Sequence, residues 1–140
     1  MEITNSNIFL IRSGFILFVL ALLTGFFIPV LLNKRMALAA HVTGVMNALM
    51  LIVLGLAWEL LTVSPLQANI IQGSFLYATY INWIASCLAA AWGTSRQTPV
   101  AGEGFKAKPW KETVVQGLQI SLGLAILAGS ALVIYGLRSS

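Results

Sequence analysis

Hydrophobic positions in the chain gather into four long runs, separated by segments that hold most of the charged residues. The runs extend from about Ile8 to Leu32, Met36 to Val63, Asn69 to Trp92 and Thr113 to Leu137. A helix needs about 20 apolar residues to cross the ~30 Å hydrocarbon core of a bilayer, and each run is near or above that length. The pattern therefore predicts four transmembrane helices.

The connections between the runs predict how the helices are threaded. Residues 33–35 and 64–67 form the first two connections, which are short enough to make successive helices antiparallel neighbours. A longer stretch, residues 93–111, joins the last two runs and shows no sign of a second domain. We therefore expect a single membrane domain over residues 1–140, an all-α integral membrane protein with a four-transmembrane-helix up-down bundle. Pro29, near the end of the first run, is expected to kink that helix.

The first run could be mistaken for a secretory signal peptide. About twenty mostly apolar residues follow Arg12, which is too long for the h-region of a signal peptide, and the small-residue cleavage pattern is missing. We expect this run to stay attached as the first helix.

The composition excludes a soluble globular domain. Hydrophobic residues make up 59% of the chain and charged residues 9%, whereas an ordinary globular protein has about 25% charged residues. In a soluble protein the net charge of +4 would suggest a nucleic-acid partner. Here the cations lie between or near the ends of apolar runs, so we interpret them as topology signals and expect the lipid bilayer, not nucleic acid, as the partner.

The cations divide unevenly between the two ends of the expected bundle. Six lie on the side of the first and third connections: Lys34, Arg35, Arg96, Lys106, Lys108 and Lys111. Arg12 and Arg138 lie on the opposite side. Because cytoplasmic segments carry the excess of Lys and Arg, we expect the six to face the cytoplasm and both termini to lie outside.

Small residues recur at every fourth position in three of the runs: Ala40, Gly44 and Ala48; Ala85, Ala89 and Gly93; Ser121, Ala125 and Gly129. Such faces let helix backbones approach closely in a membrane. We interpret them as contacts between helices or between subunits. A bundle of four helices has little interior, so a ligand is expected between helices or between subunits.

The inventory of reactive side chains excludes several kinds of active site. The chain has one His, one Cys and four acidic residues, all of them Glu. It therefore lacks a Ser-His-Asp triad, a zinc site with several histidines and a di-iron carboxylate site. Because Cys87 is the only cysteine, an intramolecular disulfide is also excluded.

His41 is the most informative polar residue, because it lies inside the second run among mostly apolar or small neighbours. It could form an interhelical hydrogen bond, or it could be a metal or haem ligand. Asn47 follows roughly 9 Å further along the helix axis, and Gly44 between them is expected to leave a flat notch for a planar ligand. If haem binds, one imidazole with the weaker candidates Met46 and Met50 would leave an open coordination position, which favours catalysis over electron transfer.

Other polar residues are expected near His41. Antiparallel threading brings further polar or small residues to similar depths in this half of the membrane: Thr24, Gly25, Asn47, Asn82, Ser86, Gln116 and Gln119. They could surround a ligand, or they could form an interhelical hydrogen-bond network.

Glu59 is the only acidic residue inside a run, and it lies about 27 Å from His41 along the second helix. It could be a proton or cation site, or a carboxylate that reaches the outer interface. A small transporter is one alternative function, but it would need a charge nearer the middle of the membrane.

Residues 33–47 read NKRMALAAHVTGVMN, and shorter motifs follow at residues 55–58 and 80–83. These segments resemble the hydroxylaminobenzene mutases, small bacterial membrane proteins distantly related to styrene oxide isomerase. The resemblance extends from about Leu22 to Tyr135. Its most specific element is the six-residue spacing from His41 to Asn47, which styrene oxide isomerase shares.

The resemblance implies an isomerase that rearranges hydroxylaminobenzene-type aryl hydroxylamines to aminophenols, principally 2-aminophenol, without net redox change or a soluble cosubstrate. It also implies a homotrimer in the bacterial inner membrane with haem b between subunits, because styrene oxide isomerase is a trimer that uses ferric haem as a Lewis acid. Carried over to this chain, His41 would ligate the haem iron, Gly44 would lie against the haem, and Asn47 would orient the substrate.

The third run departs from the styrene oxide isomerase pattern. Asn82 matches it, but Ser86 stands where that relative has a catalytic tyrosine, and the relative's nearby acid has no counterpart. Tyr77 or Tyr80 could compensate. The candidate catalytic residues are therefore Asn47, Asn82, Ser86 and Tyr80.

Aromatic side chains such as Phe75 and Trp83 could flank an aryl substrate, although aromatic residues in membrane helices mostly pack or anchor the interfaces. Two alternatives to the isomerase stay open. One is the small transporter, for which Glu59 is the only candidate charge, and the other is a haem-binding membrane anchor without catalysis.

Overall fold

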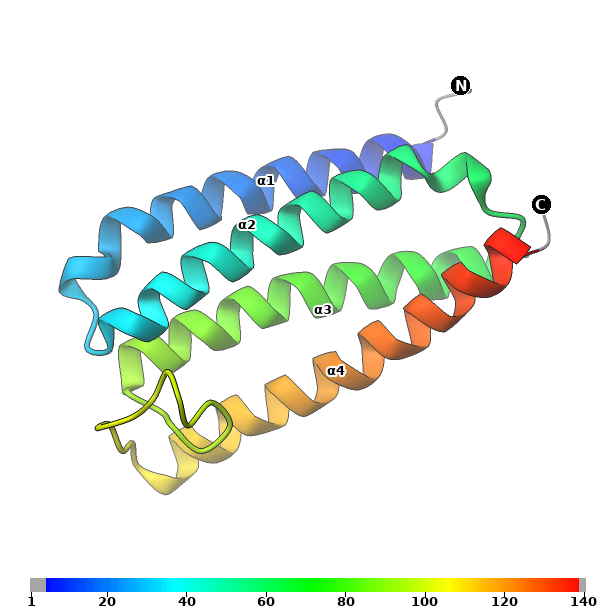
Figure 1. The fold of residues 1–140 in the computed structure, drawn as a ribbon. Coiled ribbons are helices and arrows are strands. Elements are labelled where there is room, and N and C mark those ends of the chain that lie inside the picture. Colours follow the sequence, from blue (N-terminus) through cyan, green and yellow to red (C-terminus); the bar gives the residue numbers. More distant parts are fainter. Residues whose placement is uncertain (1–4, 139–140) are drawn as a thin grey trace.

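The computed structural model describes residues 5–138 as four long helices joined end to end (Figure 1). They are α1 (Asn5–Phe27), α2 (Lys34–Leu56), α3 (Pro65–Trp92) and α4 (Pro109–Arg138), with short 3-10 helices η1 (Ile28–Val30) and η2 (Trp58–Leu60) after α1 and α2. All four long helices have the length and hydropathy to cross a membrane, and the described part of the chain contains no strand. The predicted four-helix membrane bundle is confirmed.

The threading of the helices is the expected up-down one. In Figure 1 the first turn of α1 and the last turn of α4 lie at the same end of the bundle as the connection between α2 and α3. The connections between α1 and α2 and between α3 and α4 lie at the other end, which we call the loop end. The loop end carries six of the eight cations of the chain.

The α-helices differ from the predicted spans at their ends. The first span was expected to reach Leu32, but α1 stops at Phe27 because Pro29, which has no N–H, lies in η1. The second was expected to reach Val63 and this boundary is wrong, because α2 ends at Leu56. The prediction extended the helix because residues 57–63 are mostly apolar. Their backbone, however, forms a 3-10 turn followed by an extended segment.

The third and fourth helices begin four residues earlier than their hydropathy suggests. Ser64 caps α3 by accepting a hydrogen bond from the backbone N–H of Gln67, whose side chain accepts one from the backbone N–H of Ser64. Pro65 then occupies the first turn, where no intrahelical N–H is needed. At the other end Gly93 adopts the left-handed conformation, with φ of 66°, that terminates α3.

The core lies among α1, α2 and α3, and α4 packs along α3. Leu10 and Leu17 of α1, Leu51 of α2 and Ile71 of α3 are fully buried in it. The small-residue faces lie at contacts within the chain: a Cβ on Gly44 would lie 2.6 Å from the Cβ of Ala21, and one on Gly129 would meet Ser74. Close approach between helices therefore accounts for these glycines.

The connection between α3 and α4 is tied to the helices around it. The buried carboxylate of Glu112 accepts hydrogen bonds from the backbone N–H groups of Ser95, Arg96 and Ala107. Asn33, which also caps α2, donates its side-chain amide to the carbonyl of Ala101 at 2.8 Å. The loop end is therefore an ordered part of the fold.

Candidate functional site

His41 lies in the second turn of α2 and faces α1. Its Nδ1 lies 2.7 Å from the carbonyl oxygen of Ala21. A carbonyl can only accept, so Nδ1 carries a hydrogen, and the neutral tautomer with this hydrogen has its lone pair on Nε2. Nε2 has no hydrogen-bond partner among the described residues, and the side chain is partly exposed. Metal-ligating histidines have such an arrangement, in which a carbonyl orients one ring nitrogen and the other nitrogen binds the metal.

The close fit of the His41 ring against α1 depends on Gly25. A Cβ at that position would lie 3.2 Å from His41 Nδ1, so a larger residue would push against the ring. From the sequence, Gly25 was expected roughly between the depths of His41 and Asn47, and the structure places it against the ring of His41.

Protein side chains alone do not form a metal site here. No group of three or more His, Cys, Asp or Glu side chains comes together within residues 5–138. A metal bound at His41 would therefore need ligands from elsewhere, and haem supplies four of its own in the porphyrin. The donor set, one oriented imidazole in a mostly apolar setting, fits the axial ligand of a haem.

The expected notch over Gly44 is not open within the chain. Gly44 is buried, and a Cβ there would lie 2.7 Å from Cδ1 of Trp83 on α3. The indole of Trp83 therefore fills the space in which a planar ligand was expected. Spacing along one helix shows where a gap can exist, but the neighbouring helix decides what fills it.

Asn47 bridges α2 and α3. Its side-chain Nδ2 donates to the carbonyl oxygen of Thr79 at 3.0 Å, and both residues are buried. Nδ2 has a second hydrogen and Oδ1 is an acceptor, so the amide keeps hydrogen-bonding capacity beyond this bridge.

Two other candidate catalytic residues, Ser86 and Tyr80, use their hydroxyl hydrogens in packing contacts. Ser86 donates to the carbonyl of Asn82 within α3 at 2.8 Å, and Tyr80 donates to the carbonyl of Ser13 on α1 at 2.8 Å. The amide of Asn82 itself has no side-chain hydrogen bond to any described residue. Asn82 is therefore the one candidate in α3 whose donors and acceptor are all available.

The other polar residues join in pairs, not in one cluster around His41. Tyr77 bonds to Ser121 between α3 and α4 at 2.8 Å, and Gln116 accepts from Arg96 at the loop end. Within the described residues no hydrogen bond links His41 to Gln119. This pattern supports the interpretation as interhelical hydrogen bonds for some of these side chains, Asn47 and Tyr77 among them, but not for Ser86, which bonds within α3.

Three further expectations concern residues away from His41. Phe75 is buried in the core, so it packs and does not face a substrate. Met46, a weaker candidate haem ligand, is 64% exposed on the face of α2 that points away from the other helices. Glu59 lies in η2, at the end of the bundle opposite the loop end, where it is exposed and accepts a hydrogen bond from Asn7 at 3.3 Å. It therefore does not supply the mid-membrane charge that a transporter would need.

Trp83 and Thr24 form a polar contact beside His41 that sequence reasoning did not pair. Trp83 Nε1 donates to Thr24 Oγ1 at 3.0 Å, and Thr24 Oγ1 donates to the carbonyl of Leu20 at 2.9 Å. Thr24 directly precedes Gly25, which contacts His41, and Trp83 covers Gly44. Depth along the helices had placed Thr24 in the same half of the membrane as His41, but the rotation of α3 that brings Trp83 to Thr24 could not be derived from spacing.

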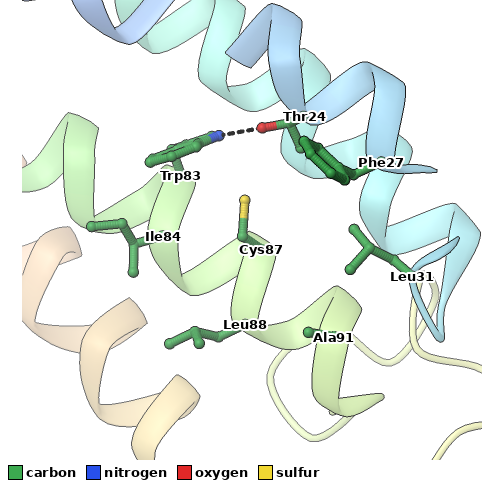
Figure 2. A pocket seen from close by; sticks show the side chains of 8 residues that line it. All are labelled: Thr24, Phe27, Leu31, Trp83, Ile84, Cys87, Leu88 and Ala91. Atoms are coloured by element: carbon green, nitrogen blue, oxygen red, sulfur yellow. Dashed lines mark hydrogen bonds between the residues drawn. The ribbon is translucent and has the colours of Figure 1, made fainter. Parts of the chain in front are cut away.

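A groove with a volume of about 440 Å³ opens beside this contact (Figure 2). Its walls come from the end of α1, the turn that follows, and the last half of α3. They consist of mostly apolar side chains: Thr24, Phe27, Leu31, Trp83, Ile84, Cys87, Leu88 and Ala91.

The chain matches the styrene oxide isomerase family over residues 7–138. It is 39% identical to the hydroxylaminobenzene mutase HabB of Ectopseudomonas oleovorans over 132 residues, which cover 94% of this chain and 80% of that protein. It is 36% identical to the hydroxylaminobenzene mutase HabA of the same organism over 130 residues, which cover 92% of this chain and 96% of that protein. No solved structure matches the chain significantly.

Proposed function

The chain belongs to the styrene oxide isomerase family and is an isomerase, and on that premise we propose that it rearranges aryl hydroxylamines such as hydroxylaminobenzene to 2-aminophenols. In this reaction the N–O bond breaks and a C–O bond forms at the neighbouring ring carbon. That carbon loses a proton and nitrogen gains one, so nitrogen ends as a primary amine. Substrate and product are isomers, so no oxidant or reductant is consumed. The names of the two mutase relatives support this substrate class.

The proposed cofactor is haem b, with His41 as the axial ligand. The observation that carries this proposal is the hydrogen bond from Nδ1 of His41 to the carbonyl of Ala21, because it leaves the Nε2 lone pair for iron. When bound, ferric haem would supply a Lewis acid for the oxygen of the N–O bond. His41 would hold the iron, and Gly25 would keep the ring in place.

Amide side chains on α2 and α3 would bind and orient the hydroxylamine. Asn82 has donors and an acceptor without a partner in the described chain, and Asn47 keeps capacity beyond its bond to Thr79. Amide N–H groups would stabilise the negative charge that develops on oxygen as the N–O bond weakens. The apolar side chains around them would exclude water and so favour return of the oxygen to the ring over its loss to solvent.

The proposed assembly is a homotrimer in the bacterial inner membrane, with the loop end in the cytoplasm and both termini outside. The excess of cations at the loop end supports the orientation. The trimer rests on the family relationship, and the single axial ligand in each chain agrees with a haem shared between subunits.

An absorption spectrum of the protein in mild detergent, followed by addition of hydroxylaminobenzene, tests function and cofactor together. The samples are wild type, His41→Ala, and Val42→Ala as a control at an exposed neighbouring position. We expect a Soret band and 2-aminophenol formation in wild type and Val42→Ala, and neither in His41→Ala.

Other outcomes of this experiment separate the proposals. Colourless wild type that still forms 2-aminophenol would retain the function and overturn the haem. A Soret band without product would indicate the haem-binding anchor, and protein with neither property would contradict both proposals.

A further inference from the structure

We propose that an anionic phospholipid binds at the loop end of the bundle, with its phosphate at Lys111 and one acyl chain in the groove of Figure 2. The two parts of this site meet where α3 ends. The inference goes beyond the proposed function and does not depend on it.

Lys111 is held between two tryptophans where α3 ends and α4 begins. Its Nζ lies 5.3 Å from the ring centroid of Trp92, the last residue of α3, and 5.6 Å from that of Trp110 in the first turn of α4. The two indoles meet edge to face with their centroids 5.3 Å apart. Because tryptophans of membrane helices concentrate at the level of the lipid headgroups, these cation–π contacts hold the ammonium of Lys111 at that level.

The positive charge of Lys111 is not neutralised by a carboxylate of the chain. Two carboxylates lie at the loop end: that of Glu103 pairs with Arg35, and that of Glu112 is buried under backbone N–H groups of the connection. Among residues 5–138, Lys111 forms no ion pair. Six cations against two carboxylates leave an excess of positive charge at this end, and such an excess attracts anionic lipids.

The contacts around Lys111 favour an anionic headgroup over a zwitterionic one. Two indole rings could hold the quaternary ammonium of a choline headgroup, but the ammonium of Lys111 already occupies that place. A phosphate would instead accept hydrogen bonds from Lys111, which has three donors. The indole N–H groups of Trp92 and Trp110 are further available donors, since neither bonds to another residue of the described chain.

The groove begins beside this cluster of Lys111 and the two tryptophans. Leu88, which lines the groove, lies one turn before Trp92, and both side chains pack against the same buried cluster of α2, α3 and α4 residues. From Ala91 the groove follows α3 back to Trp83, about 12 Å along the helix. An acyl chain that runs from a phosphate at Lys111 toward the middle of the membrane would therefore enter the groove.

The lining of the groove suits an acyl chain. Apolar side chains from the end of α1 and the turn that follows line one side, and those of α3 line the other (Figure 2). Apart from the thiol of Cys87, the polar groups are the hydroxyl of Thr24 and the indole N–H of Trp83, which bond to each other. A hydrocarbon chain needs no hydrogen bond there, whereas a polar ligand would lose its bonds to water without replacement.

Native mass spectrometry of the delipidated protein in detergent tests the headgroup site. The protein is titrated with phosphatidylglycerol and with phosphatidylcholine of the same acyl chains, and the Kd of each lipid is measured. The samples are wild type, Lys111→Gln, and Lys108→Gln as the control, which removes the same charge from an exposed position of the same connection.

We expect wild type to bind phosphatidylglycerol at least about fivefold more tightly than phosphatidylcholine. Lys108→Gln should keep most of this preference, and Lys111→Gln should lose it. Equal affinity of wild type for the two lipids would overturn the proposal. An equal loss of preference in both lysine variants would overturn it too, because it would show attraction by net charge without a site at Lys111.

Ala91→Phe tests whether an acyl chain lies in the groove. The added ring would take space from the chain, so both lipids should bind several-fold more weakly, while the preference for phosphatidylglycerol stays because Lys111 is untouched. The kept preference also shows that the loop end is still folded. Ala131→Phe, the same change at an exposed position of α4 outside the groove, is the control and should bind both lipids like wild type.

Unchanged lipid affinity in Ala91→Phe would overturn the placement of the acyl chain. Light scattering on the same variant then identifies the competing occupant. A smaller assembly together with unchanged lipid affinity would show that a second copy of the chain, and not a lipid, fills the groove.

Discussion

His41 and Asn47 each use one side-chain atom in a hydrogen bond to a carbonyl on a neighbouring helix, and the choice of atom decides what chemistry remains. His41 uses Nδ1, so the ring keeps a lone pair at Nε2 for a metal. Asn47 uses one hydrogen of Nδ2, so the amide keeps Oδ1 and a second N–H for a substrate. The same contacts therefore hold the helices together and orient the reactive atoms.

Asn47→Leu separates the structural role of Asn47 from its proposed role in binding substrate. The lost bond to Thr79 should cost about 0.6 kcal/mol, a typical value for an interhelical hydrogen bond in a membrane. If Asn47 also orients the substrate, kcat per folded molecule should fall at least tenfold, far more than the stability change explains. Thr79→Val, which keeps the carbonyl acceptor, is the control and should retain kcat. A normal kcat in Asn47→Leu would show that the residue only packs.

Gly44→Ala tests whether the contact between α2, Ala21 and Trp83 is as close as the structure shows. The added methyl would lie 2.6 Å from Ala21 Cβ and 2.7 Å from Trp83 Cδ1, so it should destabilise the fold by about 1–3 kcal/mol. The thermal midpoint in detergent measures this. Gly123→Ala, where nothing lies within 4 Å, should leave the midpoint unchanged or slightly raised. Equal midpoints in the two variants would mean that Gly44 faces open space.

At the residue scale, the count of reactive side-chain types was the sequence feature that best predicted the candidate site. His41 stands out because it is the single histidine and lies in an apolar run. Its depth in the membrane predicted that Thr24 and Gly25 lie in the same region. The partner of a small residue was not predictable, because Gly44 serves equally well under a flat cofactor or under Trp83. The rotation of α3 about its own axis decides whether Trp83 or a cofactor lies over Gly44. The periodicity of side chains along one helix does not predict that rotation.

Helix ends in this chain are set by backbone chemistry, not by hydropathy. The capping box at Ser64 and Gln67 and the left-handed Gly93 mark the ends of α3. The region after Leu56 stays apolar although α2 has ended, which is why hydropathy carried the second span to Val63. Hydropathy measures preference for lipid, and a turn at the membrane surface can be as apolar as the helix before it.

Glu112 is expected to hold the connection between α3 and α4 in place. Glu112→Ala would leave the N–H groups of Ser95, Arg96 and Ala107 without their acceptor, at about 1–3 kcal/mol for each group that stays buried. Limited trypsin digestion in detergent should then cut after Arg96 and Lys106 several-fold faster than in wild type.

The control for this digestion is Glu103→Ala, which removes an acidic side chain of the same connection. The side chain of Glu103 is exposed and forms a 3.9 Å ion pair with Arg35, whose bond to the backbone carbonyl of Glu103 is kept in the variant. Surface pairs of this kind contribute little, so the cleavage rate should stay near that of wild type. A similar acceleration in both variants would show that net charge, and not the Glu112 contacts, orders the connection.

On the scale of the whole molecule, the uneven distribution of cations predicts the orientation in the membrane. In a Cys87→Ser background, a cysteine at Thr62 would report the end with the termini, and one at Glu103 would report the loop end. We expect a membrane-impermeant maleimide to label Thr62→Cys in intact spheroplasts and Glu103→Cys only after lysis. The reverse pattern would place the loop end outside and contradict the orientation.

The proposed haem site is incomplete in one chain, and this predicts that the assembly is needed for activity. The chain offers one imidazole, Trp83 and Ala21 fill the space over Gly44, and His41 stays partly exposed. If His41 ligates a haem, we therefore expect another copy of the chain to cover it. Light scattering in detergent should give a protein mass three times the 15.1 kDa of the chain.

Mixed assemblies test whether the site is shared between copies. If His41 of one subunit works with Asn47 of its neighbour, co-expressing His41→Ala with Asn47→Leu should create some interfaces in which both residues are intact. Activity should then rise well above that of either variant alone. Each variant co-expressed with itself is the control. A mixture no more active than its parents would show that His41 and Asn47 act within one chain, because separate mutations then leave no intact site in any assembly.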